Sequence, residues 1–263
     1  MPVSRRERPA GRGAGKLIGR GLLLLVFGAS VYSLSLLATA PARMVERYAE
    51  MPPQVEALGG TIWNGSALIS GGHRLEWRVD RAGSLAALAP HFDLSLQGPG
   101  TRITAQGEVL PSGAGGTLTD VNGRASWPLA AAFATDAPRL ACDGVASLDL
   151  ARVVVQRNRI GASGIMRSTA GSCIQLDHPD RAAIPTPPLL ARATMDGDTS
   201  RALLTSADDP DTVLAEATLA DARQLALTVY PAGARLVPGL PTSGPISLEM
   251  ELPPLTARPR RDR

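Results

Sequence analysis

Residues 73–80 read HRLEWRVD, and this stretch decides the class of fold. Its apolar side chains alternate with charged ones, Leu75, Trp77 and Val79 standing between Arg74, Glu76, Arg78 and Asp80. Alternation with a period of two is typical of a β-strand that has one apolar face and one solvated face. The stretch therefore predicts a strand at the surface of a β-domain.

The same alternation recurs elsewhere in the chain. It is clear in 91–97 (HFDLSLQ), 223–230 and 245–252, and weaker in 60–70, 101–110, 116–127, 145–156, 160–167, 189–196, 201–207 and 213–219. Short Gly-rich turns separate several of these segments and leave too little chain for crossover helices. We therefore expect an all-β, antiparallel domain built on a curved sheet. Periodicity does not decide between a sandwich, a closed roll and an open trough.

Composition excludes two broad classes of protein. Hydrophobic residues make up 44% of the 263 residues and charged residues 19%, which excludes a wholly disordered chain. The formal net charge is only +3, too balanced for a dedicated nucleic-acid binder.

The positive charge is concentrated at the N-terminus. Residues 1–20 contain one acid, Glu7, and the basic residues Arg5, Arg6, Arg8, Arg12, Lys16 and Arg20. Residues 21–42 then carry no charge, and as a helix they would span roughly 33 Å, enough for a bilayer core. By the positive-inside rule, the sequence predicts a basic cytoplasmic tail (1–20), one transmembrane α-helix (21–42) and an exported remainder. A cleaved signal peptide is the competing interpretation, but its apolar region is usually shorter.

The exported part is predicted to have three regions. Residues 43–57 resemble a linker or short helix that ends at two prolines, and 58–252 form the periplasmic β-domain. The Pro-rich residues 185–188 divide it into possible lobes 58–184 and 189–252. Residues 253–263 are rich in Pro and Arg, and we expect them to be disordered.

Cys142 and Cys173 are the two cysteines, both in the part predicted to be exported. An oxidising compartment favours a disulfide between them, which would close a loop of about 30 residues. Two buried free thiols are the alternative.

The sequence offers no recognisable catalytic, cofactor or metal site. Its three histidines, His73, His91 and His178, are not at metal-ligand spacing, and HExxH, GxSxG and Walker patterns do not occur. We therefore expect a protein that is not an enzyme.

One group of motifs resembles a known family. GTIWNGSA (60–67) is followed by LEWRVD (75–80), FDLSLQGPGTRITAQGEVL (92–110) and VNGRASWPL (121–129). This order resembles the type II secretion system protein N family, best over about 40–135 and more loosely over 136–252. The motif positions in this chain, which we interpret first as determinants of the fold, are Gly60, Thr61, Trp63, Gly65, Trp77 and Trp127.

The resemblance implies a single-pass component of the inner membrane in a Gram-negative bacterium. It would support the machine that moves folded proteins across the outer membrane, with other inner-membrane secretion proteins and the lipid bilayer as partners, and without nucleic acid. A second hypothesis is a membrane-anchored periplasmic trough that binds or transfers lipid or another hydrophobic ligand. A periplasmic hydrolase is disfavoured because no acid/base pair was found.

Overall fold

The structure is a computed structural model that describes residues 32, 35, 39–47, 51–81, 83–84, 89–110, 115–133, 140–156, 158–176, 180, 182–237 and 239–252. The basic tail, most of the uncharged run 21–42 and the C-terminal residues 253–263 lie outside these ranges. Within them, no helix combines the length and the apolar character that a membrane crossing needs.

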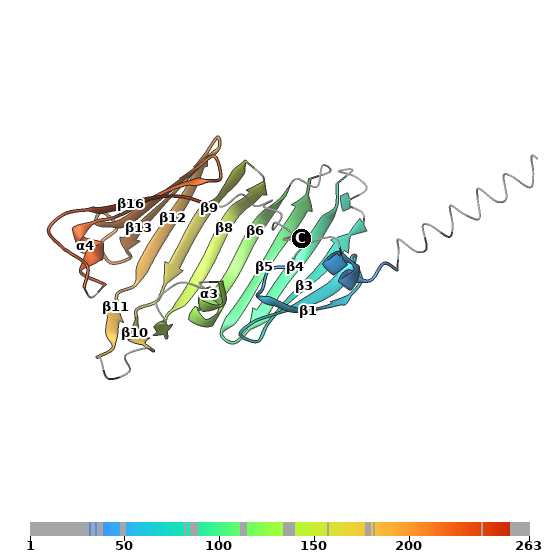
Figure 1. Cartoon of the computed structure of the whole chain (residues 1–263), viewed down its shortest axis with the longest axis horizontal. Helices are drawn as coiled ribbons and strands as arrows, with labels where there is room; N and C mark the ends of the chain where they lie inside the picture. The colour runs from blue at the N-terminus through green and yellow to red at the C-terminus, as the bar shows by residue number, and fades with distance from the viewer. Residues whose placement is uncertain are drawn as a thin grey trace, which may run out of the picture.

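Most of the described chain forms one antiparallel sheet of thirteen strands (Figure 1). Each strand lies beside its neighbour in the order β1, β2, β3, β4, β5, β6, β8, β9, β12, β13, β14, β15, β16. Their bounds are Val55–Gly60, Asn64–Ile69, His73–Asp80, His91–Gly98, Thr101–Val109, Gly115–Ser126, Val145–Gln156, Arg159–Ser168, Leu189–Asp196, Thr199–Ser206, Val213–Ala220, Gln224–Val229 and Ile246–Glu251. The all-β antiparallel prediction is confirmed.

The sheet is a single curved layer, which resolves a question that periodicity left open. Its end strands are β1 and β16, and the sheet curls toward the viewer's left, where β13 to β16 lie (Figure 1). The described strands do not form two large sheets packed face to face. Strands on both sides of the Pro-rich residues 185–188 belong to it, because β12 pairs with β9.

Residues 43–57 differ in part from the expected linker or short helix. A 3-10 helix, η1, covers Ala42–Arg47, but β1 already begins at Val55. Val55 is β-branched and lies opposite Ile69 of β2. This cross-strand contact stabilises the end of the segment as an added strand, which a linker would not provide.

A small second sheet was not predicted. It consists of β7 (Leu140–Cys142), β10 (Gly171–Gln175) and β11 (Ile184–Thr186), with β10 in the centre. Cys142 and Cys173 are directly opposite each other on β7 and β10, and the structure joins them in a disulfide with an S–S distance of 2.03 Å. Two short helices, α3 (Trp127–Phe133) and α4 (Pro231–Ala234), complete the described elements.

The two faces of the large sheet differ in chemistry. We call the apolar row the set of thirteen residues, one from each strand and each directly opposite the next, that carries no charge and no side-chain hydrogen-bonding group. It comprises Leu58, Ala67, Leu75, Leu96, Ile103, Gly123, Leu148, Met166, Ala191, Leu204, Ala215, Val229 and Ile246.

The neighbouring row on the opposite face carries a polar or charged side chain at every strand except at Gly59, Ile165 and Leu203. It comprises Gly59, Ser66, Glu76, Ser95, Thr104, Asn122, Asp149, Ile165, Arg192, Leu203, Glu216, Thr228 and Ser247. Directly opposite residues on adjacent strands share a face, so the register itself assigns each row to one side of the sheet.

Candidate functional site

The motif GTIWNGSA forms the tight turn between β1 and β2. The Thr61 backbone N–H donates to the Asn64 carbonyl at 2.8 Å, and the Asn64 N–H donates to the Thr61 hydroxyl at 3.0 Å. Gly60 adopts φ +78°, and a Cβ there would lie 2.5 Å from the Asn64 carbonyl oxygen. The turn therefore requires glycine at position 60 and a side-chain acceptor at position 61.

Trp77 of β3 is fixed to this turn by packing and by a hydrogen bond. Its indole Nε1–H donates to the Ile62 carbonyl at 3.1 Å, and its ring lies across Gly65, the residue opposite it on β2. The Val79 N–H donates to the Trp63 carbonyl at 2.7 Å and extends the same attachment. Trp63 and Trp77 are half-buried rather than enclosed in a core, because both line an open depression.

The turn is also joined to the end of the uncharged run. Pro41 forms an isolated antiparallel bridge with Thr61, and the Ile62 N–H donates to the Ala40 carbonyl at 3.0 Å. The sheet therefore begins within a few residues of the segment predicted to lie in the membrane.

An apolar pocket of about 390 Å³ opens on the apolar face beside this junction. Its lining residues come from the motif turn and from β3, β4 and β5, and they are Ile62, Trp63, Trp77, Val79, Pro90, Phe92, Leu94 and Val109. The Phe92 ring lies across Gly107 of β5 in the same way that Trp77 lies across Gly65, since a Cβ at Gly107 would come within 2.0 Å of it. Glycines on the neighbouring strands thus make room for both rings.

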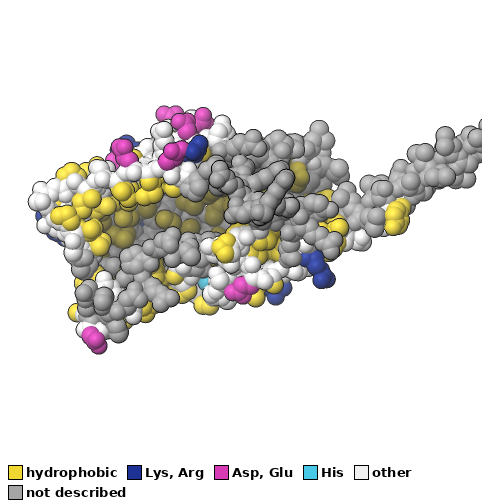
Figure 2. All heavy atoms as spheres, in the orientation of Figure 1, with side chains coloured by type: hydrophobic (Ala, Val, Ile, Leu, Met, Phe, Trp, Pro, Cys, Tyr) yellow, Lys and Arg dark blue, Asp and Glu magenta, His cyan; other side chains and the backbone are white. Residues whose placement is uncertain are grey.

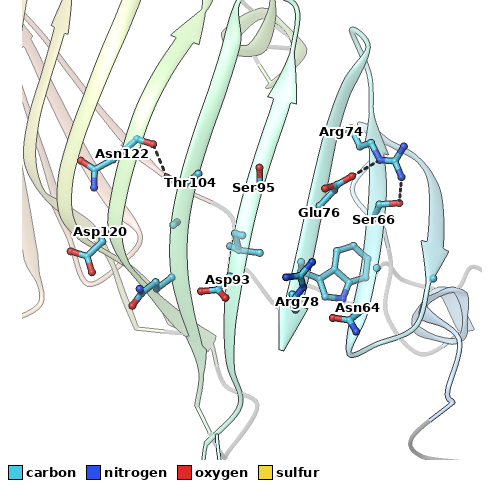
Figure 3. Close-up of a pocket in the computed structure, with 16 residues that line it drawn as sticks. Asn64, Ser66, Arg74, Glu76, Arg78, Asp93, Ser95, Thr104, Asp120 and Asn122 are labelled. Atoms are coloured by element: carbon cyan, nitrogen blue, oxygen red, sulfur yellow. Dashed lines mark hydrogen bonds and ion pairs between the residues drawn. The ribbon is translucent and has the colours of Figure 1, made fainter. Parts of the chain in front are cut away.

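A larger, polar groove of about 930 Å³ lies across β2 to β6. Figure 3 shows that the side chains labelled there come from the adjacent strands β2 to β6, with acidic, basic and amide groups intermixed. The Arg74 guanidinium pairs with Glu76 at 3.1 Å and donates to the Ser66 hydroxyl at 3.4 Å. Because charges of both signs alternate there, the groove provides no uniform field for a highly charged ligand.

The clearest electrostatic cluster lies further along the polar face. The Arg201 Nε–H donates to Glu216 Oε1 at 2.6 Å across β13 and β14, and the Tyr230 hydroxyl donates to Glu216 Oε2 at 3.4 Å. The hydrogen bond from Arg201 lowers the pKa of Glu216, assisted by the charge of Arg201 and by Tyr230 and opposed by desolvation. This cluster joins β13 and β14 to the residue that follows β15, and it resembles a structural ion pair.

A second shifted carboxylate lies beside the disulfide. Asp143 Oδ1 accepts a hydrogen bond from the Ser172 backbone N–H at 2.6 Å, and this bond lowers the pKa of Asp143. The Ser172 hydroxyl also donates to Asp143 Oδ2 at 3.3 Å, so the carboxylate joins the end of β7 to β10 through two bonds from one residue.

The structure brings together five of the six motif positions. Gly60, Thr61, Trp63, Gly65 and Trp77 meet at the β1–β2 turn. Trp127 instead begins α3 after β6 and lines neither pocket. The predicted topology residues, from Arg5 to Arg20, lie outside the described residues.

Sequence reasoning missed the pocket that surrounds these positions. The alternation in 91–97 predicts that Phe92 and Leu94 share one face of their strand, but it does not predict which neighbouring residues they meet. The register needed to bring them beside Trp77 and Trp63 was the missing information. Among the described residues, no group of three His, Cys, Asp or Glu side chains is arranged to hold a metal ion.

The fold and this site define a class of protein: an open, curved β-sheet domain that carries its charges on one face and an apolar surface on the other. The family model for type II secretion system (T2SS), protein N, matches residues 53–238, from just before β1 to just after α4. The chain belongs to this family, and so to the type II secretion machinery and to protein transport. No curated protein and no solved structure gives a significant match.

Proposed function

We propose that the protein is a non-enzymatic component of the type II secretion machinery, anchored in the inner membrane by one helix, with its β-sheet in the periplasm. The observation that carries this proposal is the family match, which covers almost the entire sheet. Its partners are other inner-membrane proteins of the same machinery.

The N-terminal sequence supports the anchored arrangement. Six basic residues precede 22 uncharged positions, which is the charge order of a helix whose N-terminus stays in the cytoplasm. The hydrogen bond from Ile62 to Ala40 and the Pro41–Thr61 bridge would then hold the motif turn close to the bilayer surface.

Strand β16 supports a role in protein contacts. The Leu252 N–H donates to the Arg223 carbonyl at 2.7 Å, so alternate residues of β16 bond to β15. The backbone groups of Ser247, Glu249 and Glu251 consequently point toward the open edge. Such an edge can receive a strand from another protein.

Cross-linking in native membranes tests the proposal. The chain carries an affinity tag after Arg263, and the captured proteins are identified after purification under denaturing conditions. We expect other inner-membrane type II secretion proteins, whereas their absence from the captured set would refute the assignment.

A backbone variant tests the edge of β16 separately. Glu249→Pro removes an outward-facing N–H without removing a bond to β15, and Glu249→Gln removes the charge but keeps the N–H. Loss of captured partners with Glu249→Pro and their retention with Glu249→Gln would place a partner strand on β16. Equal capture by both variants would exclude this edge.

A further inference from the structure

The apolar row is poorly covered for a surface of its chemistry. Of its thirteen residues only Ala67 is buried; Met166 is exposed, to 40%, and the other eleven are half-buried. Other side chains on the same face are also exposed, Leu248 to 48% and Met250 to 41%. Figure 2 shows hydrophobic side chains gathered in the hollow at the end of the molecule where β12 to β16 lie.

The uncharged surface is wider than one row. The row two residues further along each strand is Gly60, Gly65, Trp77, Leu94, Ala105, Val121, Leu150, Gly164, Ala193, Ala202, Ala217, Leu227 and Leu248. The one side-chain hydrogen-bond donor in this second row is the Trp77 indole N–H, which already donates to the Ile62 carbonyl. Thirteen strands at about 4.8 Å spacing give this surface a width of roughly 60 Å. Apolar surfaces of such extent mark binding sites.

The chemistry of the surface selects an occupant without hydrogen-bonding groups. A polypeptide laid on it in an extended form would leave buried backbone N–H and C=O groups without partners. The half of the surface from β8 to β16 is lined by Leu, Val, Ile, Ala and Met with one glycine, Gly164, whereas protein interfaces are enriched in Tyr, Trp and Arg. A saturated hydrocarbon chain meets no such penalty there.

The position of the apolar surface indicates where a hydrocarbon chain would come from. Its β1 end and the apolar pocket adjoin Ala40 and Pro41, the last residues of the uncharged run that we assign to the membrane. A hydrocarbon chain leaving the bilayer at this point reaches Trp63 and Phe92 in the pocket, and then the apolar row.

We propose that the apolar face of the thirteen-stranded sheet binds the acyl chains of membrane phospholipids, which enter at the pocket beside Trp63. This activity goes beyond a role as a component of the secretion machinery. It rests on the proposed function in one respect, the membrane anchor that brings the pocket to the bilayer.

Two adjacent residues of β13 offer a matched test. Leu204 belongs to the apolar row and Leu203 to the polar row, and both are half-buried leucines. A photoreactive phenylalanine analogue replaces one or the other in the full chain, in cells grown with radioactive phosphate. After irradiation, the chain is purified under denaturing conditions and its adducts are identified by mass. Resistance to protease before irradiation shows that each variant is folded.

We expect a phospholipid adduct at Leu204 at least tenfold above that at Leu203. A second pair strengthens the test: Ala193→Glu places a charge on the apolar face and should reduce the adduct at Leu204 at least fivefold, while Thr194→Glu, opposite Arg201 on the polar face, should leave it unchanged. Adducts of Leu204 with another protein or with the chain itself, or equal lipid labelling at both leucines, would overturn the proposal.

A third labelling position distinguishes failure of the lipid-binding proposal from failure of the membrane-anchor proposal. The same photoreactive residue at Leu24, within the uncharged run, reports contact with the bilayer. Labelling at Leu24 without labelling at Leu204 refutes lipid binding by the sheet and leaves the secretion assignment intact. No labelling at either position refutes the anchor and the lipid site together.

Discussion

The indole ring of Trp77 lies across Gly65, the residue directly opposite it on the neighbouring strand. A Cβ added at Gly65 would come within 2.2 Å of indole Cζ2 and 2.7 Å of Cε2. The same ring holds the β1–β2 turn through its hydrogen bond to Ile62. The packing of this one aromatic side chain explains the second glycine of the Gly-Thr-x-Trp-x-Gly motif, whereas Gly60 and Thr61 are required by the turn itself.

Gly65→Ala should destabilise the sheet at its N-terminal end. The added methyl group must displace the Trp77 ring or the opposing strand, and overpacking of this kind costs about 1–3 kcal/mol. Denaturant unfolding of the purified chain measures the change in the free energy of unfolding. Gly244→Ala is the matched control, because a Cβ there meets no atom within 4 Å and should change stability by less than about 0.5 kcal/mol. Equal effects of the two substitutions would contradict the packing described.

Two substitutions at Trp77 separate its ring from its N–H group. Trp77→Phe keeps most of the packing and loses the bond to the Ile62 carbonyl, which should cost about 1 kcal/mol. Trp77→Ala also removes the ring, and we expect about 3 kcal/mol, the lower end for a large aromatic side chain because Trp77 is half-buried. Thermal unfolding followed by circular dichroism ranks the variants. A folded, equally stable Trp77→Ala protein that lost its partners would instead make Trp77 an interface residue.

Much of the large sheet could be predicted from alternation alone. Residues 73–80, 145–156 and 189–196 begin and end in the structure where the sequence places them. In these segments the alternating pattern is the cause of the strand, since one face packs and the other meets water. The antiparallel order also follows where the connections are short, as from β1 to β6 and from β12 to β15, but not across the longer connections from β6 to β8 and from β9 to β12.

The remaining features depend on information that periodicity lacks. Strands β7, β10 and β11 have three to five residues, too few to show an alternation, and two of them are held by the disulfide. The openness of the sheet depends on its curvature. The pocket beside Trp63 depends on cross-strand register, which the positions of Phe92 and Val109 along the chain do not specify.

The disulfide should stabilise the small sheet. Cys142 and Cys173 are separated by 31 residues, and a loop of this length is worth about 2–4 kcal/mol. The double variant Cys142→Ser, Cys173→Ser should lower the free energy of unfolding by that amount, and hydrogen exchange in β7 and β10 should rise first.

On a non-reducing gel the natural chain should migrate faster than its reduced form, a difference that the double variant must lack. Thiol labelling of both cysteines without reductant would show that the bond is not formed in cells.

Acid should weaken the contact between β13 and β14 through Glu216. Its pKa is lowered in the folded state, chiefly by the hydrogen bond from Arg201, so the unfolded chain binds a proton more readily at this site. The stabilisation is complete above the ordinary glutamate pKa of about 4.3 and is lost as the pH falls toward the lowered value.

Glu216→Gln should therefore reduce stability at pH 7 by less than about 1 kcal/mol, because the pair is partly exposed, and should flatten the acid side of the stability curve. Denaturant unfolding at several pH values from about 3 to about 7 measures both effects, because this range spans the ordinary glutamate pKa. Glu249→Gln, at the open edge of β16, is the control. An unchanged acid limb in Glu216→Gln would assign the pH dependence to other groups.

We propose that the sheet lies beyond the membrane, held by the uncharged run 21–42. Fusions of alkaline phosphatase and of a green fluorescent protein after Arg263 test it most directly, with fusions after residue 15 as the reversed control, because the phosphatase needs an oxidising compartment to form its disulfides. We expect active phosphatase and a dark fluorescent protein after Arg263, in a chain that stays with the membrane after carbonate washing. Fluorescence without phosphatase activity, or release of the intact chain into the soluble fraction, would contradict the account.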